Sequence, residues 1–383
     1  MRTSGHNEET AVAGEKVGAF VPLPLPPKDP PLRIEGELAT ALQRAEQSLA
    51  RLELAGEMIP SKEWFLYAFM RKEAVLSSQI EGTQATLMDL LNFEAGGSLS
   101  GADETDILEV CNYLDALKYA RAELAKATGL PVSMRLLNET HKRLLKGVRG
   151  RSKQPGEIRR SQNWIGGNRP GTAVFVPPPP HRLAGLLSNL ENYIHKDDAL
   201  PPLVRAGLIH VQFETIHPYL DGNGRIGRLL ITLLLEEWKL LSEPLLYLSL
   251  YFKRNQRDYY DRLNRVRTQG DWESWLGYFL TGIAEIADEA VDTSRELFAV
   301  VSRDRAKLLK AKDSSVMSIR LFEELPRRPV VTMPAVVRAL QTTKPTAAKA
   351  INVLESIGIL IEETGRGRDR TWRYKHYLDR LGQ

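Results

Sequence analysis

Apolar residues recur at helical spacing through most of the chain, and this periodicity constrains the fold more than any other feature. Residues three or four apart share one face of a helix, so a continuous apolar stripe has to pack against other helices. The periodicity predicts helices over 37–58, 62–91, 103–126, 133–146, 181–195, 202–214, 223–241, 253–268 and 272–310. We therefore expect an all-α core whose last helix is long enough to act as a spacer.

Two segments interrupt this pattern. Residues 1–36 lack periodicity and include Pro22-Leu-Pro-Leu-Pro-Pro27, which favours an extended arm lying over a domain. Residues 161–177 carry the turn-forming pair Gly166-Gly167 before the β-prone run Thr172-Ala-Val-Phe-Val176. This second segment predicts a small surface β-hairpin between helices.

The composition changes near residue 315. The patterns beyond it predict helices over 316–325, 332–340 and 344–357, then strands over 359–362 and 371–374. Three helices followed by a hairpin are typical of a winged helix, with a recognition helix beginning at Lys344 to Lys349. The expected basic wing tip, or alternatively a solvated turn, consists of Arg366, Gly367, Arg368 and Arg370. Such a module binds DNA or docks a protein, and the fold alone does not decide between them.

A length of 383 residues exceeds one average domain. We expect an arm over 1–36, an N-terminal helical region over 37–100, a central domain over 101–290, a helical linker over 291–314 and the winged helix over 315–383.

Charge and cysteine content exclude several classes of protein. The 52 basic and 48 acidic residues are interspersed, which does not imply generic nucleic-acid binding. The single cysteine, Cys111, excludes an internal disulfide, so we expect a reducing cytosol. Residues 1–16 lack the apolar core of a signal peptide, and the longest apolar stretch, 229–241, is too short to cross a membrane.

A glycine-rich turn, Asp221-Gly-Asn-Gly-Arg-Ile-Gly-Arg228, leads directly into an apolar-periodic helix. Backbone N–H groups at a helix start lack partners within the helix and lie at its positive end, so they suit phosphate oxygens. Arg225 and Arg228 lie three residues apart, on neighbouring sides of the first turn, where guanidinium groups can bind phosphate. The pattern indicates a polyphosphate site.

His217 stands just before this turn, and Pro218 favours an extended conformation for it. A near-neutral pKa would let this histidine accept a proton from an attacking hydroxyl, while Asp221 could bind Mg²⁺. Each residue alone is more often structural, and the spacing of an EF-hand is absent. Together they indicate nucleotidyl or phosphoryl transfer.

The whole segment, His-Pro-Tyr-Leu-Asp-Gly-Asn-Gly-Arg-Ile-Gly-Arg, resembles the motif of the Fic (filamentation induced by cAMP) family, departing from it only in Tyr219 for phenylalanine. Tyr219 is expected to anchor the loop in the core. The resemblance covers roughly residues 30–290 and implies a protein adenylyltransferase with a helical Fic core and a β-hairpin flap. It leaves the winged helix unassigned.

The resemblance also implies roles for individual residues. His217 would be the base and Asp221 the Mg²⁺ ligand. The implied nucleotide-binding residues are Gly222, Asn223 and Gly224 at the α- and β-phosphates, Arg225 and Arg228 at the β- and γ-phosphates, and Ile226 and Gly227 between them. Glycine at 224, where kinase members of the family carry lysine, favours AMP transfer.

A second element, Ser77-Ser-Gln-Ile-Glu81-Gly82, resembles the family's inhibitory helix. Glu81 would form a bidentate ion pair with Arg228 and take up the guanidinium that should orient the γ-phosphate. Without the motif downstream, Glu81 and Gly82 would be read as an exposed carboxylate and a kink.

Residues 161–177 lie where the family has its flap, whose edge adds an extended target peptide. The expected edge strand consists of Thr172, Ala173, Val174, Phe175 and Val176. The alternative is a hairpin with a purely structural role. Gln212 and Tyr260 either line the nucleotide pocket or make core contacts.

The expected activity is transfer of AMP from ATP, with Mg²⁺, to a Tyr, Thr or Ser hydroxyl of a protein partner, self-modification included. One alternative is a DNA-binding regulator whose Fic domain senses nucleotide. Another keeps the fold but transfers UMP or phosphate. We expect no membrane partner, and a homodimer only as the general rule for soluble proteins.

Overall fold

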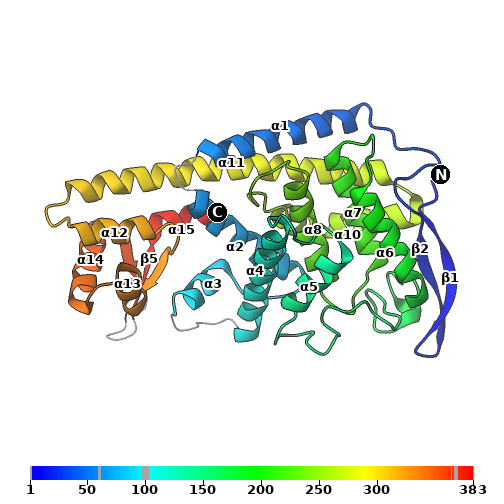
Figure 1. Ribbon diagram of the computed structural model, residues 1–383, viewed down its shortest axis with the longest axis horizontal. Coiled ribbons are helices and arrows are strands. Elements are labelled where there is room, and N and C mark those ends of the chain that lie inside the picture. The colour runs from blue at the N-terminus through cyan, green and yellow to red at the C-terminus, as the bar shows by residue number, and fades with distance from the viewer. Residues whose placement is uncertain (1, 59–61, 97–102, 364, 366–369, 383) are drawn as a thin grey trace.

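The computed structural model describes residues 2–58, 62–96, 103–363, 365 and 370–382 (Figure 1). Its longest helix, α11 (Trp272–Lys310), runs along one side of the molecule, and α1 (Glu37–Met58) lies alongside it. Arg51 of α1 pairs with Asp288 of α11 at 2.7 Å. One half of α11 thus covers the N-terminal core and the other half carries the C-terminal module.

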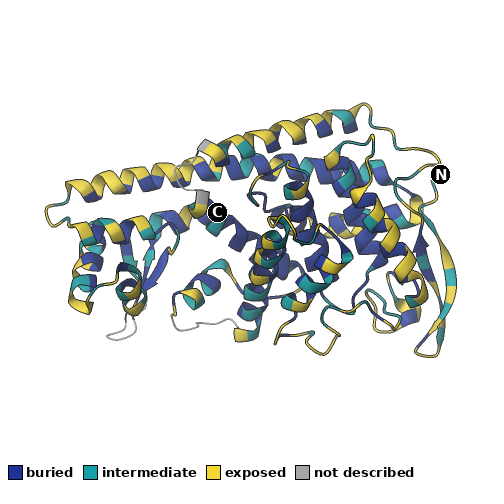
Figure 2. Ribbon diagram, viewed as in Figure 1, coloured by how far each residue is buried: buried dark blue, intermediate teal, exposed yellow. Residues whose placement is uncertain are grey.

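The core beneath these two helices is helical, as the periodicity predicts. Its helices are α2 (Lys62–Ile80), α3 (Leu87–Glu94), α4 (Glu104–Leu124), α5 (Met134–Leu144), α6 (Pro180–His195), α7 (Pro202–Ile216), α8 (Asn223–Glu237), α9 (Ser249–Arg254) and α10 (Gln256–Gln269). Helix α8 lies at the centre and is buried on nearly all sides (Figure 2). The glycine-rich turn therefore opens into the interior of the protein.

Two predicted helices are each divided in the structure. The range 62–91 breaks after Ile80, because Gly82 adopts a left-handed backbone (φ 97°) and Thr86 starts a new helix with a capping box to Asp89. The range 253–268 breaks at Asn255. Glu81 therefore lies in a turn after α2 instead of within a helix.

The N-terminal arm is more ordered than expected. It forms an antiparallel hairpin of β1 (Gly5–Val12) and β2 (Glu15–Pro22), joined at Gly14, which has a positive φ. The Phe20 N–H donates to the Val176 carbonyl at 2.9 Å, so β2 lies directly against the segment expected to be the flap edge.

The strand predicted over 172–176 is wrong. A 3₁₀ turn covers Pro170–Thr172, and a single bridge joins Ile165 to Phe175. Gly166 and Gly167 both adopt positive φ. They reverse the chain within so few residues that the β-sheet hydrogen bonds cannot continue beyond the bridge. The chain reversal itself is present.

The C-terminal module has the predicted winged-helix elements, which are α12 (Val316–Glu324), α13 (Met333–Leu340), α14 (Lys344–Ser356), β4 (Leu360–Glu362) and β5 (Thr371–Tyr374). Sequence patterns missed β3 (Val330–Thr332), which completes an antiparallel sheet of order β3-β5-β4, and the final α15 (Lys375–Leu381). Of the expected wing-tip residues, Arg366, Gly367 and Arg368 lie outside the described residues.

The module is joined to the core by polar contacts as well as by α11. Tyr374 donates to Asp304 of α11 at 3.1 Å, and Thr332 donates to the Ala95 carbonyl beyond α3 at 2.9 Å. Within the described ranges, no helix is both long enough and apolar enough to cross a membrane.

Candidate active site

His217 ends α7 and does not adopt the extended conformation expected before Pro218. It is the C-cap residue, in the left-handed region at φ 50° and ψ 62°, and its N–H donates to the Phe213 carbonyl. Arg159 fixes the backbone beyond it, donating from Nε to the His217 carbonyl and from its own N–H to the Pro218 carbonyl, both at 2.9 Å. The end of α7 thus sets the direction of the imidazole.

The His217 imidazole is partly buried and lies near two cations. Burial lowers its pKa to about 3, and the nearby cations Arg267 and Arg159 act in the same direction. Its Nδ1 has no hydrogen-bond partner among the described residues. The expected near-neutral pKa is therefore wrong for this conformation, and the ring is neutral at pH 7, which is the form a general base requires.

The loop after His217 is held by reciprocal hydrogen bonds. Asn223 accepts from the Tyr219 N–H and donates to the Tyr219 carbonyl, each at 2.8 Å. The Tyr219 ring is fully buried, stacks on His141 at 3.9 Å and donates to Asn138. Tyr219 anchors the loop as predicted, whereas the Asn223 side chain is committed to the loop and leaves only its backbone for phosphate.

Asp221 presents a half-exposed carboxylate beside this loop. Its Oδ1 accepts from the Gly222 N–H at 2.6 Å, and His141 Nε2 donates to its carbonyl at 2.9 Å. Among the described residues, no cluster of three or more acidic, His or Cys side chains could hold a metal ion. One carboxylate fits Mg²⁺, which is commonly bound by one or two carboxylates together with waters and substrate phosphates.

The start of α8 has the geometry of an anion site. Gly222 is the N-cap with φ 77°, and no side chain caps this end of the helix. A Cβ at Gly224 would lie 2.2 Å from Glu81 Oε1, so glycine here lets a carboxylate approach the first turn.

Two other motif residues point into the core. Ile226 is fully buried and its N–H donates to the Gly222 carbonyl, while Gly227 lies against Glu214. Neither has a free group for the nucleotide contact expected of it.

Arg228 joins the motif to the segment that resembles an inhibitory helix, although the two lie 147 residues apart. Its Nη2 donates to Glu81 Oε1 at 2.8 Å, and further bonds run from Nε to Ser77 Oγ and from Nη2 to the Ser77 carbonyl, both at 2.9 Å. The guanidinium is 2% exposed. The contact expected between Glu81 and Arg228 is present, but through one carboxylate oxygen instead of two.

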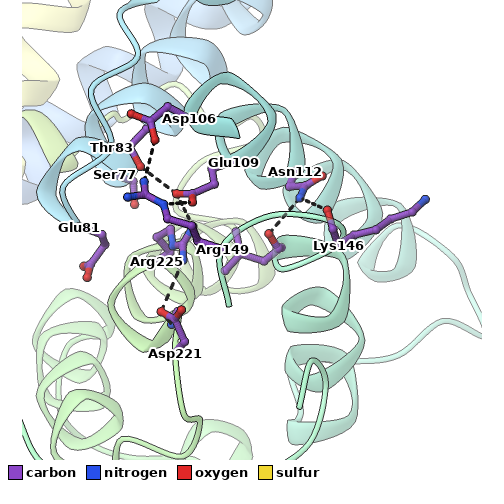
Figure 3. A network of polar contacts seen from close by, with 12 residues as sticks. Ser77, Glu81, Thr83, Asp106, Glu109, Asn112, Lys146, Arg149, Asp221 and Arg225 are labelled. Carbon is purple, nitrogen blue, oxygen red and sulfur yellow. Dashed lines mark hydrogen bonds and ion pairs between the residues drawn. The ribbon is translucent and has the colours of Figure 1, made fainter. Parts of the chain in front are cut away.

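The Arg225 guanidinium faces α4. It lies 3.4 Å from Glu109 and 3.7 Å from Asp221 (Figure 3). Asp106 and Glu109 were missed by the sequence analysis, although acidic residues three apart among the apolar residues of α4 are a signal for a buried ionic cluster.

The weaker candidates are dispersed. The Gln212 amide donates to the Leu23 carbonyl at 2.9 Å and so contacts the arm, and Tyr260 is 45% exposed beside Tyr259. Residues 173–176 line one side of a cleft of about 500 Å³, with β1 and α10 residues forming its other walls. In this segment Phe175 is buried, whereas the Val174 side chain is 71% exposed.

This architecture is a mostly helical Fic fold with small antiparallel sheets. Residues 131–235 match the model of the Fic/DOC family, and residues 39–122 match the model of the Fic/DOC family N-terminal region. This chain is a Fic/DOC family protein.

The chain is also a distant homologue of Fic adenylyltransferases. It is 29% identical over 216 residues to a protein described as protein adenylyltransferase Fic in Drosophila grimshawi, and likewise in Drosophila willistoni. The match covers 56% of this chain but only 40% of the Drosophila grimshawi protein, so the chain spans less than half the length of that relative.

Solved structures share the fold. A Fic family protein from Desulfovibrio desulfuricans superposes with a TM-score of 0.58 at 21% identity, covering 90% of this chain and 98% of that one. Fic-1 from C. elegans superposes with a TM-score of 0.52 at 20% identity, covering 68% and 74%.

Proposed function

We propose that this protein transfers AMP from ATP to a Tyr, Thr or Ser hydroxyl of a protein, and that Glu81 restrains the reaction. One observation carries the proposal. The Glu81 carboxylate lies on Arg228 and against Gly224, at the uncapped start of α8 that suits an anion. The distant homology to adenylyltransferases supports AMP as the transferred group.

In the proposed reaction, the target hydroxyl oxygen bonds to the α-phosphorus of ATP, and the bond from that phosphorus to the bridging oxygen breaks, releasing pyrophosphate. The hydroxyl proton passes to His217, which is neutral over the physiological range because burial lowers its pKa to about 3. Glycine at 224 and a helix start without a side-chain cap leave room for phosphate oxygens.

Asp221 is the residue that would hold Mg²⁺, with water and phosphate completing the shell. When bound, the ion would neutralise charge that develops on the phosphates. Arg225 lies between Asp221 and Glu109, so its guanidinium is held beside the carboxylate that would bind the ion.

Restraint follows from competition for one guanidinium. A γ-phosphate and the Glu81 carboxylate are both anions, and Arg228 has one donor edge facing the start of α8. Ser77 continues to hold Arg228 when Glu81 leaves, so the arginine stays positioned for phosphate.

Incubation with Mg²⁺ and ATP followed by intact-mass analysis tests the proposal. We expect an AMP adduct, on the protein itself or on an added target, that is larger for Glu81→Gly than for the native chain and absent for His217→Ala. Glu157→Gly is the matched control, because it removes an exposed loop carboxylate whose ion-pair partner is Arg160 instead of Arg228. Equal adducts in the native chain and Glu81→Gly at saturating ATP would refute the restraint. A UMP or phosphate adduct would change the transferred group.

A second candidate, DNA binding by the C-terminal module, is supported by how the module is placed. It faces the core through α12, α15 and β3, whereas α14 packs on α12, α13 and β4 within the module. Lys344, Lys349 and Asn352 are exposed on α14. Residues 315–383 hold 12 basic and 7 acidic residues, so the module carries the positive excess of the chain.

Duplex binding measured by anisotropy against salt concentration tests this candidate. We expect Lys344→Glu/Lys349→Glu to weaken binding and to reduce its salt dependence. Lys153→Glu/Lys196→Glu makes the same charge change on exposed lysines outside the C-terminal module and should have little effect on duplex binding. Equal losses in both double variants, or no duplex binding at low salt, would favour a protein partner for this face.

A further inference from the structure

An ionic cluster, buried except for Arg149, connects the motif to the Glu81 turn, which we define as residues 81–84. The cluster consists of Thr83, Asp106, Glu109, Arg149 and Arg225 (Figure 3). Its two carboxylates come from α4, its two arginines come from the loop after α5 and from α8, and Thr83 comes from the turn. Four segments distant in sequence therefore meet at one point.

Glu109 is the centre of this cluster. Its Oε2 accepts from Thr83 Oγ1 at 2.9 Å and lies 3.4 Å from Arg225 Nη1, and its Oε1 accepts from Arg149 Nε at 2.7 Å. Thr83, Glu109 and Arg225 are all at least 96% buried. One carboxylate oxygen thus contacts the turn and the motif at once.

Asp106 provides a parallel connection. It accepts from the Gln84 N–H at 2.6 Å and from Arg149 Nη2 at 2.8 Å. Two carboxylates face two guanidinium groups within the cluster, and the Asp221 carboxylate lies a further 3.7 Å from Arg225, so neutralisation of charge does not involve Thr83. The Thr83 hydroxyl is therefore bound by the cluster but is not needed to neutralise it.

We propose that Glu109 is a positioning residue that orients Arg225 and, through Thr83, holds the turn that places Glu81 on Arg228. The inference rests on the proposed function. Because the amides of Glu81, Gly82 and Thr83 bond back to Ser78 and Gln79, the turn continues α2 on one side and is tied to α4 on the other. Releasing the α4 side lets the turn open and Glu81 leave Arg228.

Thr83→Val tests the connection with the smallest change, since valine keeps the shape and removes only the hydroxyl. We expect hydrogen exchange of the amides at 81–84 to accelerate, and AMP transfer to rise about tenfold, the size expected for one hydrogen bond to a charged acceptor. Thr83→Ser retains the hydroxyl and should behave like the native chain. In a Glu81→Gly background, Thr83→Val should change the transfer rate little.

The outcomes separate the two levels of the proposal. Unchanged exchange in Thr83→Val, or an equal rate increase with and without Glu81, would overturn the role of Glu109. Absence of any AMP adduct in Glu81→Gly would refute the proposed function, and the exchange comparison of Thr83→Val with Thr83→Ser would still decide whether Glu109 holds the turn.

Discussion

The loop of residues 217–224 and the segment of residues 161–177 lie next to each other but are held in different ways. The loop is partly buried and is fixed by paired bonds between Asn223 and Tyr219, with His141 stacked on the Tyr219 ring. The 161–177 segment has one β-bridge of its own, and further bonds join it to β2 and, from Asn163, to the Tyr219 carbonyl of the loop. We therefore expect the proposed chemistry to need a fixed loop, whereas the proposed docking of a target would tolerate an adaptable edge.

Acid should destabilise the loop side most. Burial lowers the pKa of His141 to about 4 and those of His210 and His217 to about 3, so the folded chain keeps them neutral where the unfolded chain binds protons. Their contribution is complete above pH 6.5 and is lost as pH falls toward 4, at about 1.4 kcal/mol per histidine per pH unit. Denaturant titrations between pH 7 and 5 measure this slope, and His217→Ala should reduce it by about a third.

Tyr219→Ala should be the most damaging single truncation, lowering the free energy of unfolding by about 4 kcal/mol, because it leaves a cavity against His141 and Phe213. Val174→Ala in the adjacent segment should change stability by less than about 0.5 kcal/mol, since its side chain is 71% exposed. Chemical denaturation of both variants tests the contrast, and similar losses would contradict it.

Asn223→Ala should lower the free energy of unfolding by about 2 kcal/mol, because it leaves the buried Tyr219 N–H without a partner and removes one of the two donors to the Tyr219 carbonyl, the other being Asn163. Transfer by Asn223→Ala in a Glu81→Gly background should fall more than ATP affinity does. Activity retained at the Glu81→Gly level would show that the loop does not have to be fixed.

Glu15→Ala should have the smallest effect. It removes the acceptor of the Gly171 N–H and the partner of Arg169, an ion pair near the surface worth less than about 1 kcal/mol. Global stability should stay nearly constant while amide exchange at 169–176 accelerates. Exchange that remains slow would mean that this edge is as fixed as the loop.

Features that depend on local sequence could be predicted from the residues alone, whereas contacts between distant segments could not. Helix ranges were predictable because burial of a stripe is a local property, and the meeting of Glu81 with Arg228 followed from the family resemblance. The hairpin of β1 and β2 could not be predicted in this way, since its strand Gly5–Val12 is mostly polar. The bonds that hold the arm, from Phe20 to Val176 and from Gln212 to Leu23, join segments distant in sequence. Pairing of Glu109 with Arg225, 116 residues apart, has no periodic signal either.

The central claim is that the Glu81 carboxylate occupies the place on Arg228 that a terminal phosphate needs. Calorimetric titration of Mg·ATP and Mg·ADP into His217→Ala, with and without Glu81→Gly, tests this claim without turnover. We expect Glu81→Gly to tighten ATP binding at least about tenfold, the scale of a charge-assisted contact, and to leave ADP nearly unchanged. Equal tightening for both nucleotides, or none for ATP, would contradict the account.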